Sequence, residues 1–109
     1  MSALIRAVIH AQECNEGNIA DQRLVRPDIV EALNAWADGS HPYVGDFLRA
    51  VLSNNLKEAV MRADAYNLVT LPAIVNYVYN RLPFDCQGSP EIVAAWQATH
   101  RERRREEAT

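Results

Sequence analysis

Apolar residues along the chain recur with the spacing of α-helices rather than with the alternation of β-strands. The segment FLRAVLSNNLKEAVMRADAYN, residues 47–67, shows this most clearly, because apolar positions three and four apart flank a polar Ser-Asn-Asn step. Short polar side chains compete for backbone hydrogen bonds and favour helix ends over helix interiors. The step therefore predicts the end of one helix and the start of another, with Asn55 as the new N-cap.

The second helix of this pair has further features of a capped helix. With Asn55 as the cap, Glu58 falls at the third helical position, which approximates a capping box, and it can pair with Arg62 one turn later. Asn67 is expected to end the helix in a left-handed conformation. The positions expected to face inward are Leu56, Ala59, Val60 and Ala63.

Prolines that follow polar residues predict where four helices begin. A proline in the first turn costs no hydrogen bond, because the N–H that it lacks has no partner there. The expected first-turn prolines are Pro27, Pro42, Pro72 and Pro90. Thr70 is the expected cap before the third of them and Ser89 the cap before the fourth, while Gly39 and Pro83 mark expected ends.

The apolar positions of these four helices define the expected core. They are Ile29, Val30, Leu33 and Trp36 in the first helix, Val44, Phe47, Leu48, Val51 and Leu52 in the second, Leu71, Ile74, Val75, Val78 and Leu82 in the third, and Ile92, Val93 and Trp96 in the last. Gly45 either weakens its helix or permits close helix approach. We expect an all-α domain, a compact bundle of five or six short helices, each about 9 to 14 residues long.

The chain length is that of a single domain. Its 109 residues can enclose one modest core, so we expect one helical domain over 1–109. Within it, 1–26 would form an N-terminal element and a loop, 27–100 the helical core, and 101–109 a charged tail. In the N-terminal element the apolar positions Leu4, Ile5, Val8 and Ile9 fit a helix, with a strand as the alternative. Because the core is modest, we expect a homodimer or a larger symmetric oligomer.

Composition and charge narrow the classes of function. Apolar residues make up 49% of the chain, which is too many for a disordered protein. The net charge is −3 and the pI is near 5.5, so nucleic acid is not an expected partner. The one dense basic run, HRERRREEAT, is interleaved with glutamates and is interpreted as a solvated helix end.

Cysteine usage and hydropathy indicate the compartment. Cys14 and Cys86 lie far apart and form no CxxC motif, so free thiols in a reducing compartment are expected. No apolar run approaches the ~18 residues of a membrane span, and no signal-peptide pattern is present. These features predict a cytoplasmic protein without a membrane partner.

Motifs for catalysis, metals and cofactors are weak in this sequence. His10 and Cys14 have the i, i+4 spacing of two metal ligands on one helix face, but a third ligand is not visible. A nucleophilic pair of Cys86 with a histidine has no neighbour that would lower the thiol pKa. Glycine-rich phosphate loops are absent. We therefore expect no cofactor, no metal site and no enzymatic activity.

Tyrosine, asparagine and arginine gather in the second half of the chain. Tyrosine and arginine combine apolar area with a polar tip and are enriched where binding energy concentrates in protein interfaces. The alternative is that the rings complete the core. The residues of the hypothetical binding surface are Tyr43, Tyr66, Asn67, Asn76, Tyr79, Asn80 and Arg81, with Tyr77 beside them.

Three separated stretches resemble a family of small, largely uncharacterised proteins of tailed bacteriophages and prophages. They are HPYVGDFLRAVLSNNLKEAVMRADAYN, LPAIVNYVYNRLP and CQGSPEIVAAW, which together cover about half of the chain in the same order. The family has an aromatic residue after the cysteine, where this chain has Gln87. The resemblance implies a phage origin and action in the cytoplasm of an infected bacterium, and it implies no specific activity.

Together these features favour a non-enzymatic accessory protein that disables a host component, in evasion of a bacterial defence. The partner would be a host bacterial protein, bound by a helix face, or a small nucleotide-like ligand, held by tyrosine stacking between protomers. The alternatives are a small DNA-binding regulator and a virion assembly factor. As a DNA reader, the second helix of the Ser-Asn-Asn pair would offer only Lys57 and Arg62.

Overall fold

Helices make up the part of the chain that the structure, a computed structural model, describes. It describes residues 22–108, and no strand occurs among them. The elements are η1 (Gln22–Leu24), α2 (Pro27–Asp38), α3 (Asp46–Leu52), α4 (Leu56–Arg62), α5 (Ala65–Val69), α6 (Leu71–Arg81), η2 (Phe84–Cys86) and α7 (Pro90–Ala108). The all-α prediction is confirmed. The predicted element at residues 3–12, with His10 and Cys14, lies outside the described residues.

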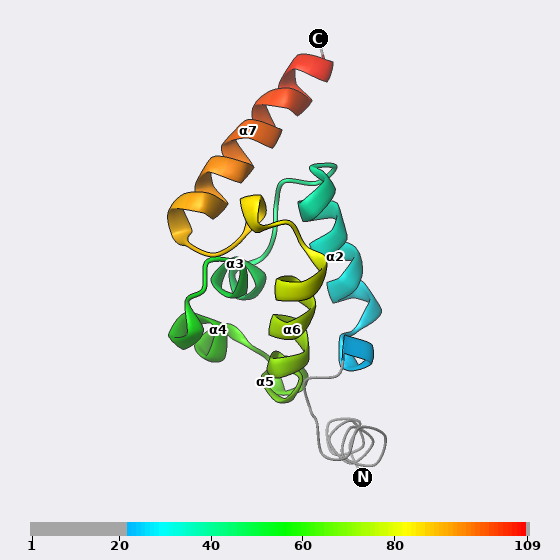
Figure 1. Cartoon of the computed structure of the whole chain (residues 1–109), viewed down its shortest axis with the longest axis vertical. Coiled ribbons are helices and arrows are strands. Elements are labelled where there is room, and N and C mark those ends of the chain that lie inside the picture. Colours follow the sequence, from blue (N-terminus) through cyan, green and yellow to red (C-terminus); the bar gives the residue numbers. More distant parts are fainter. Residues whose placement is uncertain (1–21, 109) are drawn as a thin grey trace.

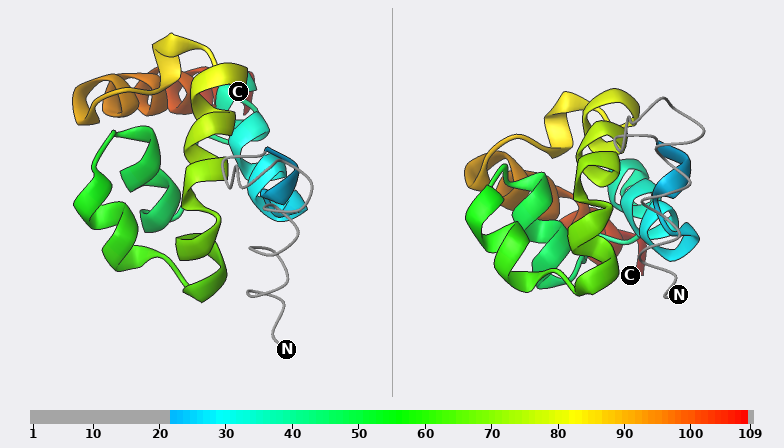
Figure 2. Two further views of the ribbon diagram at one scale, coloured as in Figure 1. Left: turned by 60° about the horizontal axis from the view of Figure 1, so that its bottom comes forward. Right: turned by 90° about the horizontal axis from the view of Figure 1, so that it is seen from below.

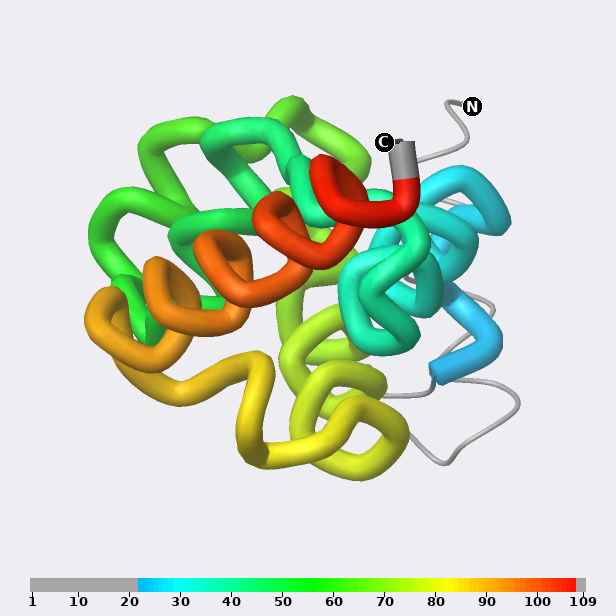
Figure 3. Tube along the Cα trace, turned by 90° about the horizontal axis from the view of Figure 1, so that it is seen from above, coloured from blue at the N-terminus to red at the C-terminus, as the bar shows by residue number. Residues whose placement is uncertain are grey.

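Helix α6 occupies the centre of the arrangement. It lies between α2 on one side and the antiparallel α3–α4 pair on the other (Figures 1 and 2). The first turns of α7 run across the end of α3 and reach the end of α2 (Figure 3). Its last turns project beyond the other helices (Figure 1). The short helix α5 links α4 to α6 at the opposite end of the molecule.

Several helix boundaries follow the local rules that predicted them. Pro27 occupies the first turn of α2, and Gly39 ends that helix with a left-handed φ of 80°. Asn55 caps α4 by accepting a hydrogen bond of 3.2 Å from the backbone N–H of Glu58. Ser89 Oγ accepts from the N–H of Ile92 at 3.2 Å, as an N-cap of α7 does. These starts and ends are confirmed.

The predicted helix start at Pro42 is wrong. Residues 41–45 form no helix, and α3 begins at Asp46 with Gly45 as its N-cap. Pro42 is instead buried, and its carbonyl accepts a hydrogen bond of 2.9 Å from Gln97 Nε2 of α7. A Cβ on Gly45 would meet nothing within 4 Å, so this glycine does not serve close helix packing. Tertiary contacts of the 41–45 segment therefore override the local proline signal.

The single helix predicted after Asn55 is divided in two. Ala63 adopts an extended conformation with ψ of 139°, and Asp64 then caps α5 by accepting 2.7 Å from the N–H of Asn67. Asn67 is therefore an interior residue of α5, and the left-handed ending predicted for it is wrong. The predicted lengths are also wrong for α3, α4 and α5, which have seven, seven and five residues, and for α7, which has 19.

The core is formed by side chains of α2, α3, α6, η2 and α7. Leu33, Trp36, Ile74, Cys86 and Val93 are among its most completely buried members. Four residues that were expected inside are exposed instead. They are Leu56, Val60, Val75 and Ile92. Periodicity identifies the apolar side of a helix but not what covers it, so these assignments were wrong.

Two polar residues at helix ends differ from the expected pattern. Thr70 precedes α6, but its hydroxyl donates backward to the carbonyl of Tyr66 at 2.9 Å and caps nothing. The buried side chain of Gln87 donates from Nε2 to the carbonyls of Val78 at 2.7 Å and Leu82 at 3.0 Å. This amide satisfies the carbonyls of the last turn of α6.

The Arg- and Glu-rich end continues α7. Val93 and His100 of this helix are buried, and Trp96 and Gln97 between them are half-buried, while residues 101–107 are all exposed. A stripe at positions i, i+3, i+4 and i+7 therefore attaches only the first part of α7. In the chain from residue 22 to 108, no helix is both long and apolar enough to cross a bilayer.

Candidate binding groove

An apolar groove runs along the surface between α4, α5 and α6. Its volume is about 610 Å³. It is lined by Leu56 of α4, Leu68 of α5, and Leu71, Pro72, Val75, Asn76, Tyr79 and Asn80 of α6. The exposed fractions are 68% for Leu56, 47% for Leu68 and 65% for Tyr79. Large apolar side chains that are this exposed and this close together are typical of surfaces that contact another molecule.

The groove exists because α6 is apolar on two sides. Leu71, Ile74 and Val78 pack into the core, and the face with Val75 and Tyr79 points to solvent. The solvent side follows the same helical period, since Pro72, Val75 and Tyr79 lie at i, i+3 and i+7. A helix that only supported the core would carry polar residues there. Among the residues that the structure describes, this second apolar side has no covering element.

A second hollow adjoins the groove on the same face. It has a volume of about 370 Å³ and lies where α6 meets η2 and the α3–α4 turn. The rings of Tyr79 and Phe84 stand 5.7 Å apart at its edge, and Phe84 is 66% exposed. Val75 and Tyr79 line both the hollow and the groove. The apolar face is thus continuous from α5 to η2.

Amide side chains form the polar rim of the groove. Asn76 Oδ1 accepts hydrogen bonds from Gln22 Nε2 at 2.6 Å and from Asn80 Nδ2 at 3.2 Å. Gln22 Oε1 accepts in turn from Arg81 Nε at 3.0 Å. Among the residues that the structure describes, none of those that line the groove is charged.

The structure brings three of the predicted site residues together. Asn76, Tyr79 and Asn80 lie on the groove, and Arg81 lies just beyond its rim. Tyr43 lies apart from them, beside His41 and Arg101 at the other end of the molecule. Tyr77 points to α2, where its hydroxyl donates to Asn34 Oδ1 at 2.7 Å.

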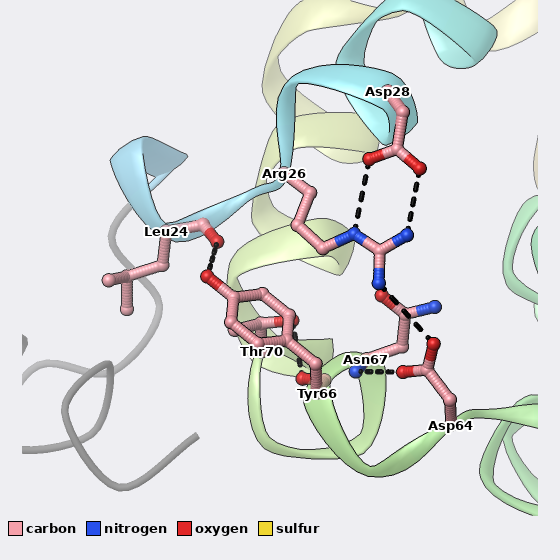
Figure 4. Close-up of polar contacts among 7 residues, drawn as sticks. All are labelled: Leu24, Arg26, Asp28, Asp64, Tyr66, Asn67 and Thr70. Atoms are coloured by element: carbon pink, nitrogen blue, oxygen red, sulfur yellow. Dashed lines mark hydrogen bonds and ion pairs between the residues drawn. The ribbon is translucent and has the colours of Figure 1, made fainter. Parts of the chain in front are cut away.

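Tyr66 and Asn67 belong to a different cluster, centred on Arg26 (Figure 4). The guanidinium of Arg26 donates to both carboxylate oxygens of Asp28, at 2.8 and 3.1 Å, and pairs with Asp64 at 3.3 Å. It also lies 5.7 Å from the ring centre of Tyr66. Asn67 is buried, and none of the described residues forms a hydrogen bond with its Oδ1. The cluster joins the start of α2 to α5, and none of these side chains lines the groove.

The Arg26 cluster shifts the acidity of its members. Hydrogen bonding to Arg26 holds the pKa of Asp28 below its usual value. The same hydrogen bond raises the pKa of Arg26 well above its usual value, and the charges of both carboxylates act in the same direction. Both groups are therefore charged throughout the physiological range, as a structural ion pair requires.

Another hollow, between α2 and α7, is lined by charges of both signs. It has a volume of about 480 Å³ and is lined by Asp38, Gly39, Ser40, His100, Arg103, Arg104 and Glu107. Serine, histidine and aspartate thus meet there, but Ser40 Oγ donates to the carbonyl of Ala35 at 3.5 Å and not to His100. Arg104 donates to the carbonyl of Ser40, so it fastens α7 to the end of α2. The arrangement lacks the nucleophile–base contact that acyl transfer needs.

The remaining chemical candidates have structural partners. Burial raises the pKa of the Cys86 thiol to about 11, and its Sγ donates to the carbonyl of Pro83 at 3.2 Å, so this cysteine is protonated at neutral pH. Within residues 22–108, no three His, Cys, Asp or Glu side chains gather as metal ligands. Arg62 pairs with Glu58 at 3.2 Å and with Asp46 at 3.5 Å, whereas Lys57, the other basic residue of α4, forms no ion pair within the described part of the chain.

Sequence reasoning missed the apolar half of the groove. Leu56 and Val75 were assigned to the core, and Leu68, Leu71 and Pro72 were not connected with binding. The sequence of α6 did carry a usable signal. Its apolar residues cover more of the helix circumference than a single contact with the core needs, and they stand at positions 71, 72, 74, 75, 78 and 79. The contributions of α4 and α5 depend on tertiary structure and had no such signal.

Comparison of the chain with protein-family models, with curated proteins and with solved structures gave no match.

Proposed function

We propose that this protein is a binding module that captures an apolar segment of another protein in the α4–α6 groove. The observation that carries the proposal is the exposed, uncharged apolar face of Leu56, Leu68, Val75 and Tyr79. A groove between helices with an apolar floor and an amide rim is the kind of site that takes the apolar side of an amphipathic helix. Exposed apolar surface also carries a solubility cost that a docking role explains.

The chemistry of the groove favours a protein segment over a nucleotide-like ligand. Tyr79 could stack on a base, but the phosphates of a nucleotide are bound most strongly by cationic groups, and none of the described residues that line the groove is charged. The nearest arginine on α6, Arg81, is held by Gln22 at 3.0 Å. Apolar side chains of a partner would instead contact Leu56 and Leu68 directly.

The biological setting of the proposal comes from the resemblance to small phage and prophage proteins. In that setting the captured segment belongs to a host protein, and capture inhibits it, which would help a phage to evade a bacterial defence. The protein would act by occupancy in the host cytoplasm and would need no catalytic group. Polar side chains that could serve in catalysis take part in structural contacts instead, such as the protonated thiol of Cys86 and Arg62 in its ion pair, and this suits such a role.

The test is partner capture by the full chain and by two matched variants. Tagged protein is incubated with bacterial lysate, and bound proteins are identified by mass spectrometry. Leu68→Glu places a charge in the groove, and Val60→Glu places one on an exposed apolar site of α4 outside it, where the exposed fraction of 40% is close to the 47% of Leu68. We expect Val60→Glu to retain the captured protein and Leu68→Glu to lose at least about 90% of it, because an unpaired charge would be buried at the contact.

Two results would overturn the proposal. One is equal recovery of the same partner by both variants, which would place the contact outside the groove. The other is an increase in melting temperature with a nucleotide that Tyr79→Leu abolishes while Val60→Glu keeps it, which would assign the groove to a stacked base. Melting temperatures of all variants without ligand control for loss of fold.

A further inference from the structure

Val75 and Tyr79 form a ridge along α6 with a hollow on each side. The groove lies on the side of Leu56 and Leu68, and the second hollow lies on the side of Phe84. Val75 also lines a third, smaller hollow between α3, α4 and α6, of about 170 Å³. The same surface therefore carries both a protruding element and the depressions that could receive one.

This face has the size of a protein interface. Leu56, Leu68, Val75, Tyr79 and Phe84 are each between 47% and 68% exposed. Together they present on the order of 500 Å² of apolar surface, which lies in the upper part of the ~300–600 Å² that the largest apolar patch of a monomer spans, a patch that is often functional. It also matches the apolar share of the ~800 Å² that each partner of a stable complex buries.

The charge distribution allows two copies to meet at this face. The chain has a net charge of −3, so identical copies repel each other in general. None of the residues that line the groove or the adjoining hollow is charged. The face is thus uncharged, and contact between two copies there buries no pair of like charges.

We propose that a second copy of this chain covers the face in the free protein. A two-fold axis close to Val75 would lay the α6 helices of the two copies against each other, so that the Val75–Tyr79 ridge of each copy enters the groove of the other. Such an isologous contact needs a surface that carries a ridge and a matching depression side by side. The α6 face meets this requirement.

The dimer would regulate the groove, and this consequence rests on the proposed function. Because the second copy and a partner segment use the same side chains, the two compete, and partner capture requires dissociation of the dimer. The apparent affinity for a partner then falls as the protein concentration rises above the dissociation constant of the dimer. Dilution of the protein therefore favours the capture of a partner.

Sedimentation of the full chain over a range of about 1 to 100 μM tests the proposal. We expect a monomer–dimer equilibrium. Val75→Glu should raise its dissociation constant at least about tenfold, because the substitution buries a charge next to the two-fold axis, whereas Val60→Glu should leave the dissociation constant unchanged. A monomer throughout the range would overturn the proposal, since the face would then be left to a partner or to another segment of the same chain. A dimer that Val75→Glu does not weaken would also overturn it.

A cysteine at position 75 provides a second readout that does not depend on dimer strength. In a Cys14→Ser background, Val75→Cys should form an intermolecular disulfide under mild oxidation, because residues close to a two-fold axis approach within the ~7 Å that a disulfide spans. Val60→Cys in the same background is the control, and we expect it to cross-link at least about ten times more slowly. Equal rates at the two positions would overturn the placement of the axis.

These results separate the dimer from the proposed function. A monomeric protein that captures a partner through Leu68 would overturn the dimer and leave the proposed function in place. A dimer that depends on Val75, with no partner captured below its dissociation constant, would support the dimer and count against the proposed function.

Discussion

The indole nitrogen of Trp96 donates a hydrogen bond of 2.8 Å to the backbone carbonyl of Trp36, and the indole nitrogen of Trp36 donates one of 2.9 Å to the carbonyl of Cys86. These two bonds connect α2 to η2 and to α7, which follow it by about 50 residues or more in the sequence. Trp36 is completely buried, whereas Trp96 is only half-buried. The two tryptophans are therefore expected to contribute unequally to the stability of the contact between α2, η2 and α7.

Substitution of the tryptophans should reveal this inequality. Trp36→Phe leaves a buried carbonyl without a donor and opens a small cavity, and we expect it to lower the free energy of unfolding by about 2 to 4 kcal/mol. Trp96→Phe removes one hydrogen bond at a partly exposed site and should cost about 1 kcal/mol. Urea denaturation measures both values. The reverse order would contradict the placement of Trp36 in the core.

Gly39 is expected to tolerate no side chain. Its φ is +80°, and a Cβ there would lie 2.3 Å from Nδ1 of His100, whose ring is fixed against Trp96 with 4.3 Å between ring centres. Gly39→Ala should therefore cost at least about 1 to 3 kcal/mol in thermal or urea unfolding. Gly45→Ala is the control, because a Cβ there meets nothing within 4 Å, and it should cost less than about 1 kcal/mol. Equal losses would argue against the close approach of α7 to the end of α2.

The boundaries of most helices could be predicted from the sequence because local chemistry determines them. Pro27, Gly39, Asn55 and Ser89 act through their own backbone or through a side chain bonded three residues away. The break at Asp64 obeys the same cap rule and was missed because the apolar period continues through it. The start at Pro42 was wrong because contacts with α7 hold that proline outside a helix.

The groove could be predicted only in part. Asn76, Tyr79 and Asn80 were selected because of their residue types, and they lie on one face because they share α6. Leu56 and Leu68 join them only because the extended conformation of Ala63 separates α4 from α5, which no pattern in the sequence indicates. Exposure of Val75 depends on what packs against α6, so periodicity alone places it in the core.

The ion pair of Arg26 with Asp28 predicts how stability depends on pH. The pKa of Asp28 is lower in the folded protein than its ordinary value near 3.9, so the stabilisation is present above that value and is lost as the pH falls through the folded-state pKa. Asp28→Asn should therefore lower the melting temperature at pH 7, and the difference from the unchanged protein should shrink as the pH falls below the ordinary pKa of an aspartate.

Glu31 offers a control for that experiment. It is exposed on the same helix and has no ion pair among the residues described. Glu31→Gln should show no comparable change between neutral and acidic pH. A difference for Asp28→Asn that stays constant or grows on acidification would contradict the ion pair.

Cys86 should react slowly in the folded protein. With its side chain buried and a pKa of about 11, only about one thiol in a thousand is ionised at pH 8. In a Cys14→Ser background, alkylation by iodoacetamide followed by mass spectrometry should be at least about a hundred times slower in buffer than in 6 M guanidinium. Rapid labelling under native conditions would mean that η2 opens readily.

Photo-cross-linking from the groove in living bacteria tests the central claim most directly. A benzophenone amino acid is introduced into the full chain at position 68 or, as the control, at position 60, and the covalent products are identified by mass spectrometry. We predict that position 68 forms an adduct with a specific bacterial protein and that position 60 does not. The same adducts from both positions, or no adduct with another protein from position 68, would contradict the assignment of the groove as the binding site.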